Sequence, residues 1–157
     1  MPDLAIPEKP PSLKPIIKML GGSGVLKHKL STRLDAHELQ LRGLPAAALT
    51  HLMASFVLPH DPAALGKAIG MSLRTMQRRK SASNENLSPE QSGRTWKFAE
   101  ILARATAIFG SREEAEAWLE RPAIGLGRRR PIDLLATTTG AEIVETHLGR
   151  IEYGVYA

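Results

Sequence analysis

The feature that most constrains the fold is a set of helix start and stop signals between residues 88 and 114. Residues 88–91 (Ser-Pro-Glu-Gln) combine an N-cap, a proline suited to the first turn and a glutamine at the capping-box position. We expect a helix from there to Phe109, ended by Gly110. Its predicted core residues are Phe98, Ile101, Leu102, Ala105 and either Ile108 or Phe109. Residues 111–114 form a second capping-box pattern, which predicts another helix that carries Trp118 and Leu119 and stops before Pro122.

The composition extends this helical prediction to the whole chain of 157 residues. Aromatic residues make up only 4% of it, whereas alanine and leucine abound. Straight-chain residues lose little rotamer freedom in a helix, and alternating β-branched runs are absent except near the C-terminus. The sequence therefore predicts an all-α fold, with both tryptophans serving as core or interface anchors.

Further helices are predicted on either side of this region. We expect one at Lys14–Leu20, one capped by Asp35 with Glu38 at the capping-box position, and one at Pro45–Val57. Two more, Pro131–Thr138 and Ala141–Leu148, are expected on either side of a break at Gly140. Residues 1–15 carry prolines throughout and predict a flexible, extended arm, because proline fixes φ and lacks an N–H donor. Residues 81–86 are a polar linker and the best candidate for a domain boundary.

Residues 61–80 have the pattern of a helix-turn-helix unit. Pro62–Ile69 is the expected first helix, with Leu65 and Ile69 facing the core, and Gly70 can supply the positive φ of the turn. Ser72 then caps a second helix, on which Leu73 and Met76 are expected to face inward.

The second helix carries donors suited to DNA. The chain has a net charge of +5, and residues 61–80 hold five cations against the single acid Asp61. Arginine can bind guanine with two hydrogen bonds and glutamine can bind adenine. The predicted DNA-binding residues are Ser72, Arg74, Thr75, Gln77, Arg78, Arg79 and Lys80, with Arg79 and Lys80 nearest the phosphates. The alternative is a helix pair with a solvated basic face. Since one such unit seldom binds tightly alone, a homodimer on a two-fold operator is expected.

The residues give no indication of an enzyme. There is no cysteine, and the five histidines lack metal-ligand spacing. The pairs Glu113 and Glu116, and Glu142 and Glu145, suggest solvated helix surface. Residues 125–130 resemble a glycine-rich phosphate cradle, but no strand precedes them, so a loop between helices is the better interpretation. We expect no catalytic residue, cofactor, metal or small-molecule substrate. Without a signal peptide or a membrane span, a cytoplasmic protein is expected.

The chain from Trp118 onward resembles the toxin-binding domain of the Xre/MbcA/ParS antitoxin family. The resemblance covers about the last 70 residues, and residues 62–80 resemble the Xre-type helix-turn-helix that precedes this domain in the family. The matching features are Ala117-Trp118-Leu119, Pro122, Leu126-Gly127, Pro131 to Leu135, Gly140, Val144 and Leu148 to Gly154.

The resemblance implies a function and a domain order. Such antitoxins pair with a RES-domain toxin, which is similar to ADP-ribosyltransferases and consumes NAD or modifies a target with it. The antitoxin covers the toxin's active-site entrance and represses its own operon as a dimer. The implied domains are the arm at 1–15, a helix-turn-helix domain at 16–84 and a toxin-binding domain at 85–157.

The predicted toxin-binding residues lie in a triple arginine and at the C-terminus. They are Arg128, Arg129, Arg130, Arg150, Glu152, Tyr153, Val155, Tyr156 and Ala157. The arginines could pair with acidic toxin residues or form a solvated loop, and they stand where the family usually has a glycine-rich pair. The tyrosine-containing tail could enter an apolar cleft or simply fray. Two other functions stay open, a stand-alone transcriptional regulator and an adaptor whose basic helix contacts a protein or membrane surface.

Overall fold

The computed structural model describes residues 12–81 and 84–154, and over these ranges the chain is helical, with two isolated β-bridges in place of strands. The all-α prediction is confirmed. Val155, Tyr156 and Ala157, most of the predicted arm and part of the predicted linker lie outside the described residues. The helices are α1 (Lys14–Met19), α2 (Gly22–Leu26), α3 (Arg33–Arg42), α4 (Ala46–Ala54), α5 (Pro62–Ile69), α6 (Leu73–Ser81), α7 (Pro89–Phe109), α8 (Arg112–Leu119), the 3₁₀ turn η1 (Ile124–Leu126), α9 (Pro131–Leu134) and α10 (Thr138–Glu152).

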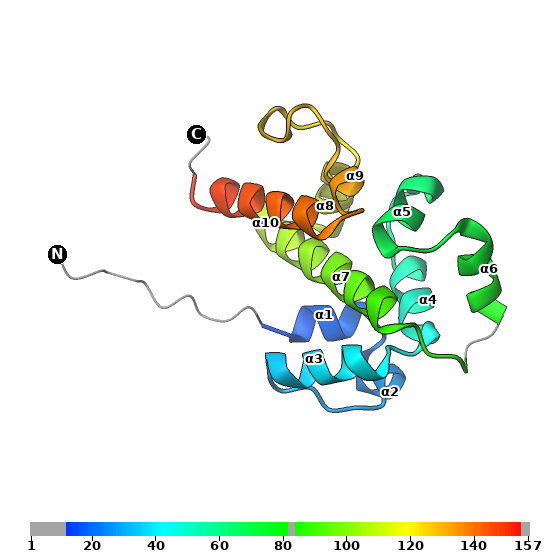
Figure 1. Ribbon diagram of the computed structural model, residues 1–157. Coiled ribbons are helices and arrows are strands. Elements are labelled where there is room, and N and C mark those ends of the chain that lie inside the picture. Colours follow the sequence, from blue (N-terminus) through cyan, green and yellow to red (C-terminus); the bar gives the residue numbers. More distant parts are fainter. Residues whose placement is uncertain (1–11, 82–83, 155–157) are drawn as a thin grey trace, which may run out of the picture.

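Helix α7 is the central element, and it contacts α1, α3, α5, α8 and α10 (Figure 1). Its predicted ends are confirmed. The Gln91 amide donates to the Ser88 hydroxyl and the Ser88 amide donates to the Gln91 side chain, each at 3.1 Å. At the other end Gly110 takes the left-handed conformation, with φ of 91°. One helix thus supports both the N-terminal and the C-terminal parts of the chain.

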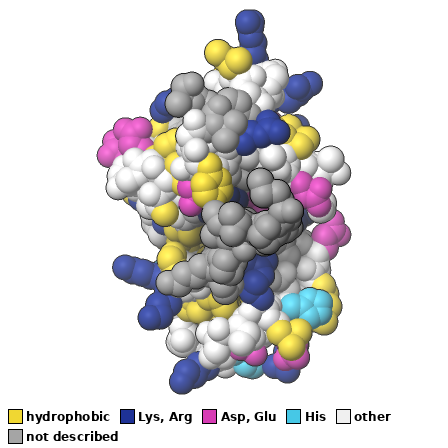
Figure 2. Space-filling model, turned by 90° about the vertical axis from the view of Figure 1, so that its left-hand side faces the viewer, with side chains coloured by type: hydrophobic (Ala, Val, Ile, Leu, Met, Phe, Trp, Pro, Cys, Tyr) yellow, Lys and Arg dark blue, Asp and Glu magenta, His cyan; other side chains and the backbone are white. Residues whose placement is uncertain are grey.

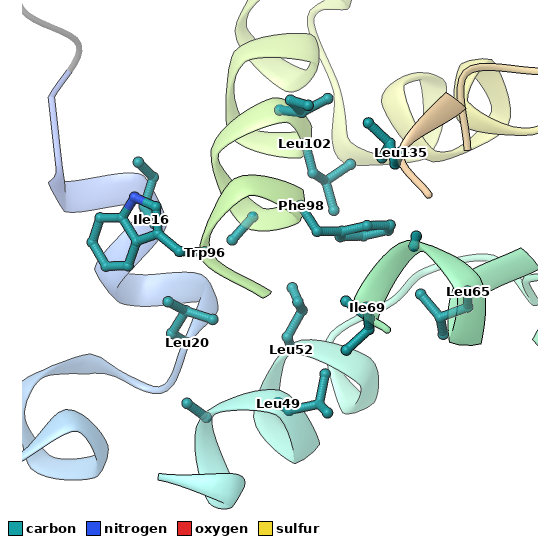
Figure 3. Close-up of a cluster of buried hydrophobic side chains, with 14 of the residues drawn as sticks. Ile16, Leu20, Leu49, Leu52, Leu65, Ile69, Trp96, Phe98, Leu102 and Leu135 are labelled. Carbon is teal, nitrogen blue, oxygen red and sulfur yellow. The ribbon is translucent and has the colours of Figure 1, made fainter. Parts of the chain in front are cut away.

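The buried side chains form one core rather than two (Figure 3). Trp96 of α7 points toward α1, and Phe98 points from α7 toward α5, where Leu65 and Ile69 lie. Leu102, one turn further on, lies beside Leu135 of the C-terminal half. The predicted core positions Phe98, Ile101, Leu102, Ala105 and Trp118 are all buried, whereas Ile108 and Phe109 are half-buried. Because this cluster is continuous, the two halves of the chain are packed against each other.

One predicted helix start is confirmed and another is wrong. Helix α1 begins at Lys14, as predicted, and Pro15 lies in its first turn, where proline is tolerated, so the arm predicted for residues 1–15 must end before this helix. Asp35 is not the cap of α3. Thr32 is the N-cap and Asp35 completes the capping box from position N3, so Glu38 plays no capping part. The backbone bonds from Ser31 and Thr32 lower the pKa of Asp35.

The predicted break at Gly140 is wrong. The chain leaves the helical path between α9 and α10 at residues 135–137, and Gly140 lies in the first turn of α10, where its amide donates to the Thr137 cap at 2.9 Å. A side chain at Gly140 would collide with the Leu134 carbonyl. This glycine therefore permits a close approach of α9 to α10 and does not end a helix.

Candidate nucleic-acid and partner interfaces

Helices α5 and α6 and the turn between them form the predicted helix-turn-helix. Asp61 caps α5 by accepting from the Ala63 amide at 3.0 Å. Gly70 has φ of 82°, as the turn requires, and Leu65 and Ile69 are buried. The Thr75 amide donates to the Ser72 hydroxyl at 3.1 Å, which confirms that Ser72 caps α6. The Ser72 hydroxyl itself donates to Thr75 Oγ1 at 2.9 Å.

The outer face of α6 carries several of the predicted DNA-binding side chains. Met76 is buried as predicted, but Leu73 is 43% exposed, so the prediction that both face inward is wrong for Leu73. Leu73 lies toward the flank of the helix, where it lines a groove with residues 56–60 and Gln77. The exposed polar residues of the helix are Arg74, Gln77, Arg78 and Lys80, with Thr75 half-buried. Because α6 lies at the edge of the molecule (Figure 1), these exposed residues form a basic surface there.

Arg79 has partners within the chain. Its guanidinium lies 2.6 Å from a Glu85 carboxylate oxygen and donates to the Asn86 carbonyl at 3.4 Å. The contact fastens the end of α6 to the segment before α7. Its predicted contact with DNA phosphate would compete with this ion pair.

Arg130 also binds within the chain, and it connects the C-terminal half to α5. Its guanidinium donates to Asp61 at 3.1 Å and to both carboxylate oxygens of Asp133, at 2.8 and 2.9 Å. The Arg130 bond is the main cause of a lowered pKa of Asp61, and the two carboxylates raise the pKa of Arg130. Arg130 therefore holds the N-cap of α5, whereas Arg128 and Arg129 are exposed.

The segment before α5 is bound by a buried glutamate that the sequence interpretation missed. Glu116 of α8 is fully buried, not solvated. Its carboxylate accepts from the amides of Val57 and Leu58 at 3.0 Å and lies 2.8 Å from both His60 Nε2 and Arg112 Nε. Burial by itself raises the pKa of Glu116, but these bonds outweigh it and the pKa is lowered. The sequence signal that could have revealed this burial is the position of Glu116 between Ala115 and Leu119, on the apolar side of α8.

Two more contacts join α8 and the residue after it to the segment before α5. His60 Nδ1 lies 2.8 Å from a Glu120 carboxylate oxygen, and the Asp61 amide donates to Glu120 at 2.9 Å. At the other end of α5, one Arg94 amino group donates to the carbonyls of Lys67 and Ala136, at 3.1 and 2.9 Å. The first helix of the helix-turn-helix is thus bound at both ends by residues that follow residue 90.

Of the other predicted toxin-binding residues, the structure describes Arg150, Glu152 and Tyr153, at the C-terminal end of α10. Arg150 lines a groove between α10 and the loop before α9. Glu152 forms an ion pair with Arg104 at 3.3 Å, and Tyr153 is exposed at the end of the helix. These three residues are therefore near one another, and Arg128 and Arg129 lie on the neighbouring loop.

Within residues 12–81 and 84–154 no helix combines the length and apolarity that a membrane span requires. In the same ranges, histidine and acidic side chains form no group of three or more that could hold a metal ion.

The α5–α6 pair defines a helix-turn-helix protein with a second helical unit packed onto it. Residues 35–100 match the family described as the antitoxin Xre-like helix-turn-helix domain. Residues 104–154 match the antitoxin Xre/MbcA/ParS C-terminal toxin-binding domain. The chain therefore belongs to the Xre family of antitoxins, and its two matched segments meet inside α7.

Named relatives agree with this assignment. An Antitoxin Xre of Yersinia enterocolitica is 35% identical over 108 residues, which cover 68% of this chain and 70% of the relative. A Prs ADP-ribosylating antitoxin of Sphingobium sp. is 30% identical over 125 residues, or 74% of this chain and 77% of the relative. An Antitoxin Xre of Photorhabdus laumondii is 33% identical over 87 residues, which cover 55% of this chain and 58% of the relative.

Proposed function

We propose that this antitoxin neutralises a RES-type toxin with its C-terminal half and represses its own operon through α6. The observation that carries the proposal is the packing of a basic helix-turn-helix and a toxin-binding domain around one core. We assign DNA binding to residues 16–84, toxin binding to residues 85–157, and the site of action to the cytoplasm. No catalytic step is assigned to the chain itself.

In the proposed DNA complex α6 lies in the major groove. Its exposed Arg74, Gln77 and Arg78 reach base edges, and Lys80 reaches phosphate. Ser72 acts chiefly as the cap that fixes the start of the helix, because its hydroxyl bonds the Thr75 amide. A homodimer places two copies of α6 on two half-sites, which supplies the affinity that one unit lacks.

In the proposed toxin complex the C-terminal half covers the active-site entrance of a toxin that consumes NAD. A relative whose name includes ADP-ribosylating antitoxin supports chemistry of this kind, since ADP-ribosylation takes its group from NAD. The exposed Arg128 and Arg129 suit acidic partner residues. Arg130 contributes to toxin binding indirectly, because its bonds to Asp61 and Asp133 fix the end of the loop that carries Arg128 and Arg129.

The DNA part is tested with a duplex from the promoter upstream of the gene, by fluorescence anisotropy at several salt concentrations. Arg78→Ala should weaken binding about 10- to 100-fold, because a bidentate base contact is lost. The matched control Lys29→Ala removes an exposed cation from the α2–α3 connection and should leave binding unchanged. Equal binding to the promoter and to a scrambled duplex would contradict operator recognition.

The toxin part is tested by growth. Cells that express the product of the adjacent gene alone should stop growing, and co-expression of this chain should restore growth. Arrest that persists with well-expressed antitoxin, or an adjacent product that arrests nothing, would contradict neutralisation and favour a stand-alone transcriptional regulator.

A further inference from the structure

Large apolar side chains are exposed at one end of the C-terminal half. Ile124 is 89% exposed, Tyr153 72% and Ile143 47%. All three lie within residues 104–154, which match a toxin-binding domain. Exposed apolar residues that gather at one place indicate a partner, whereas single ones need no explanation.

The loop that carries Ile124 is held in a defined shape. The Ala123 amide donates to the Arg129 carbonyl at 3.1 Å, and the Arg128 amide donates to the Ala123 carbonyl at 2.9 Å. Leu126, two residues after Ile124, is buried and anchors the loop. Ile124 is therefore presented on a preformed turn, which lowers the entropy that a partner must overcome on binding.

The loop and α10 together enclose a shallow groove. Gly125 forms one wall, and Thr139, Ile143, Thr146 and Arg150 on the outer face of α10 form the other. The groove has a volume of about 370 Å³. Tyr153 extends this wall, because residues seven apart on a helix share a face and Tyr153 is seven residues beyond Thr146.

Cations border the exposed apolar residues. Arg128 and Arg129 are exposed on the same loop, and Arg150 lies in the groove wall. Figure 2 looks onto this side of the molecule and shows hydrophobic side chains next to Lys and Arg near its top, where Figure 1 places the loop. Helix α6 lies on the opposite side in Figure 1, so a partner on this face leaves the DNA-binding helix accessible.

We propose that this loop–α10 face is the toxin docking surface, with Ile124, Ile143 and Tyr153 as its apolar anchors. Arg128 and Arg129 face acidic residues that border the apolar contact on the toxin. The occupant is the toxin rather than a second antitoxin, because the whole groove lies inside the segment matched to a toxin-binding domain. The inference rests on the proposed function and specifies where the partner binds.

The test compares charge-introducing substitutions at matched exposed positions. Ile124→Asp and Ile143→Asp place a carboxylate at the proposed contact, and Leu34→Asp does so at a 65% exposed position on α3. Affinity for the purified product of the adjacent gene is measured by calorimetry, with thermal unfolding as the check of folding. Each isoleucine variant should bind at least about 30-fold more weakly, as is typical of an interface anchor, and Leu34→Asp should bind within about twofold of the unsubstituted chain.

The outcomes separate this inference from the proposed function. If the unsubstituted chain fails to bind the adjacent gene product, the proposed function fails. If it binds and a folded Ile124→Asp variant binds equally well, the docking surface is wrong and the proposed function stands. Should sedimentation show that the isoleucine variants instead dissociate an antitoxin dimer, the face is a dimer contact and the inference is overturned. Because Ile124 is almost fully exposed, Ile124→Asp should fold even if Ile143→Asp does not.

Discussion

The guanidinium of Arg130 lies 3.1 Å from the carboxylate of Asp61, and this contact joins the C-terminal half of the antitoxin to its helix-turn-helix. Asp61 is the N-cap of α5, the first helix of the helix-turn-helix, and Arg130 follows the loop that carries Ile124. A residue of the segment that matches the toxin-binding domain therefore helps to fix the start of the helix-turn-helix.

The first prediction concerns the coupling of this pair. Asp61→Ala removes both the cap of α5 and the ion pair, whereas Asp61→Asn can keep the cap and loses the ion pair. Both should lower the urea midpoint, Asp61→Ala more strongly. In the Arg130→Gln background the effect of Asp61→Asn should shrink, because the partner is already absent. Strictly additive midpoint shifts would show that the pair contributes no coupling.

The second prediction concerns Glu116. Glu116→Ala should cost about 3–5 kcal/mol in the free energy of unfolding, because it leaves Arg112, His60 and two backbone amides without their buried carboxylate. Glu113→Ala on the exposed side of the same helix is the control, and it should change stability by less than about 0.5 kcal/mol. Urea unfolding measures both. Equal effects of the two substitutions would contradict the structural role of Glu116.

The third prediction concerns acid. The pKa values of Glu116 and Asp61 are lowered in the folded chain, so the unfolded chain binds protons first as the pH falls. Their contribution to stability is complete above the unfolded pKa values of about 4 and is lost as the pH falls through the lower, folded values. Urea midpoints from pH 7 to pH 3 should therefore drop in acid, and less steeply in Glu116→Gln. A Glu116→Gln curve parallel to that of the unsubstituted chain would contradict this assignment.

The fold was predictable where a local signal determines the structure. The ends of α7 follow from its capping box and Gly110, and the turn before α6 follows from Gly70 and Ser72. These signals extend over only three or four consecutive residues, so they can be recognised directly in the amino-acid sequence. The family resemblance likewise depended on residues that lie close together in the sequence.

The features that sequence reasoning missed depend on distant partners. Two glutamates three residues apart suggest solvated helix surface. Only the packing of α8 against residues 57–60 buries Glu116 and lets its carboxylate accept hydrogen bonds from backbone amides. Arg130 looked like part of a basic loop until Asp61, 69 residues away, was placed beside it. Gly140 looked like a helix break because its real constraint, the Leu134 carbonyl, belongs to the neighbouring helix.

The fourth prediction concerns Gly140. Gly140→Ala should destabilise the chain by about 1–3 kcal/mol, because the added methyl group collides with the Leu134 backbone and forces α9 away from α10. Gly24→Ala in α2 is the matched control, since open space surrounds that position, and it should be neutral or slightly stabilising. Thermal unfolding compares the two. A Gly140→Ala variant as stable as Gly24→Ala would contradict the close approach.

The most direct measurement is NAD consumption by the purified product of the adjacent gene, with this antitoxin added in increasing amounts. We predict that NAD loss falls to background once the antitoxin saturates the toxin, and that Leu34→Asp inhibits as well as the unsubstituted chain. Undiminished NAD loss in the presence of a demonstrated complex, or an adjacent gene product that consumes no NAD, would contradict the proposed neutralisation of a RES-type toxin.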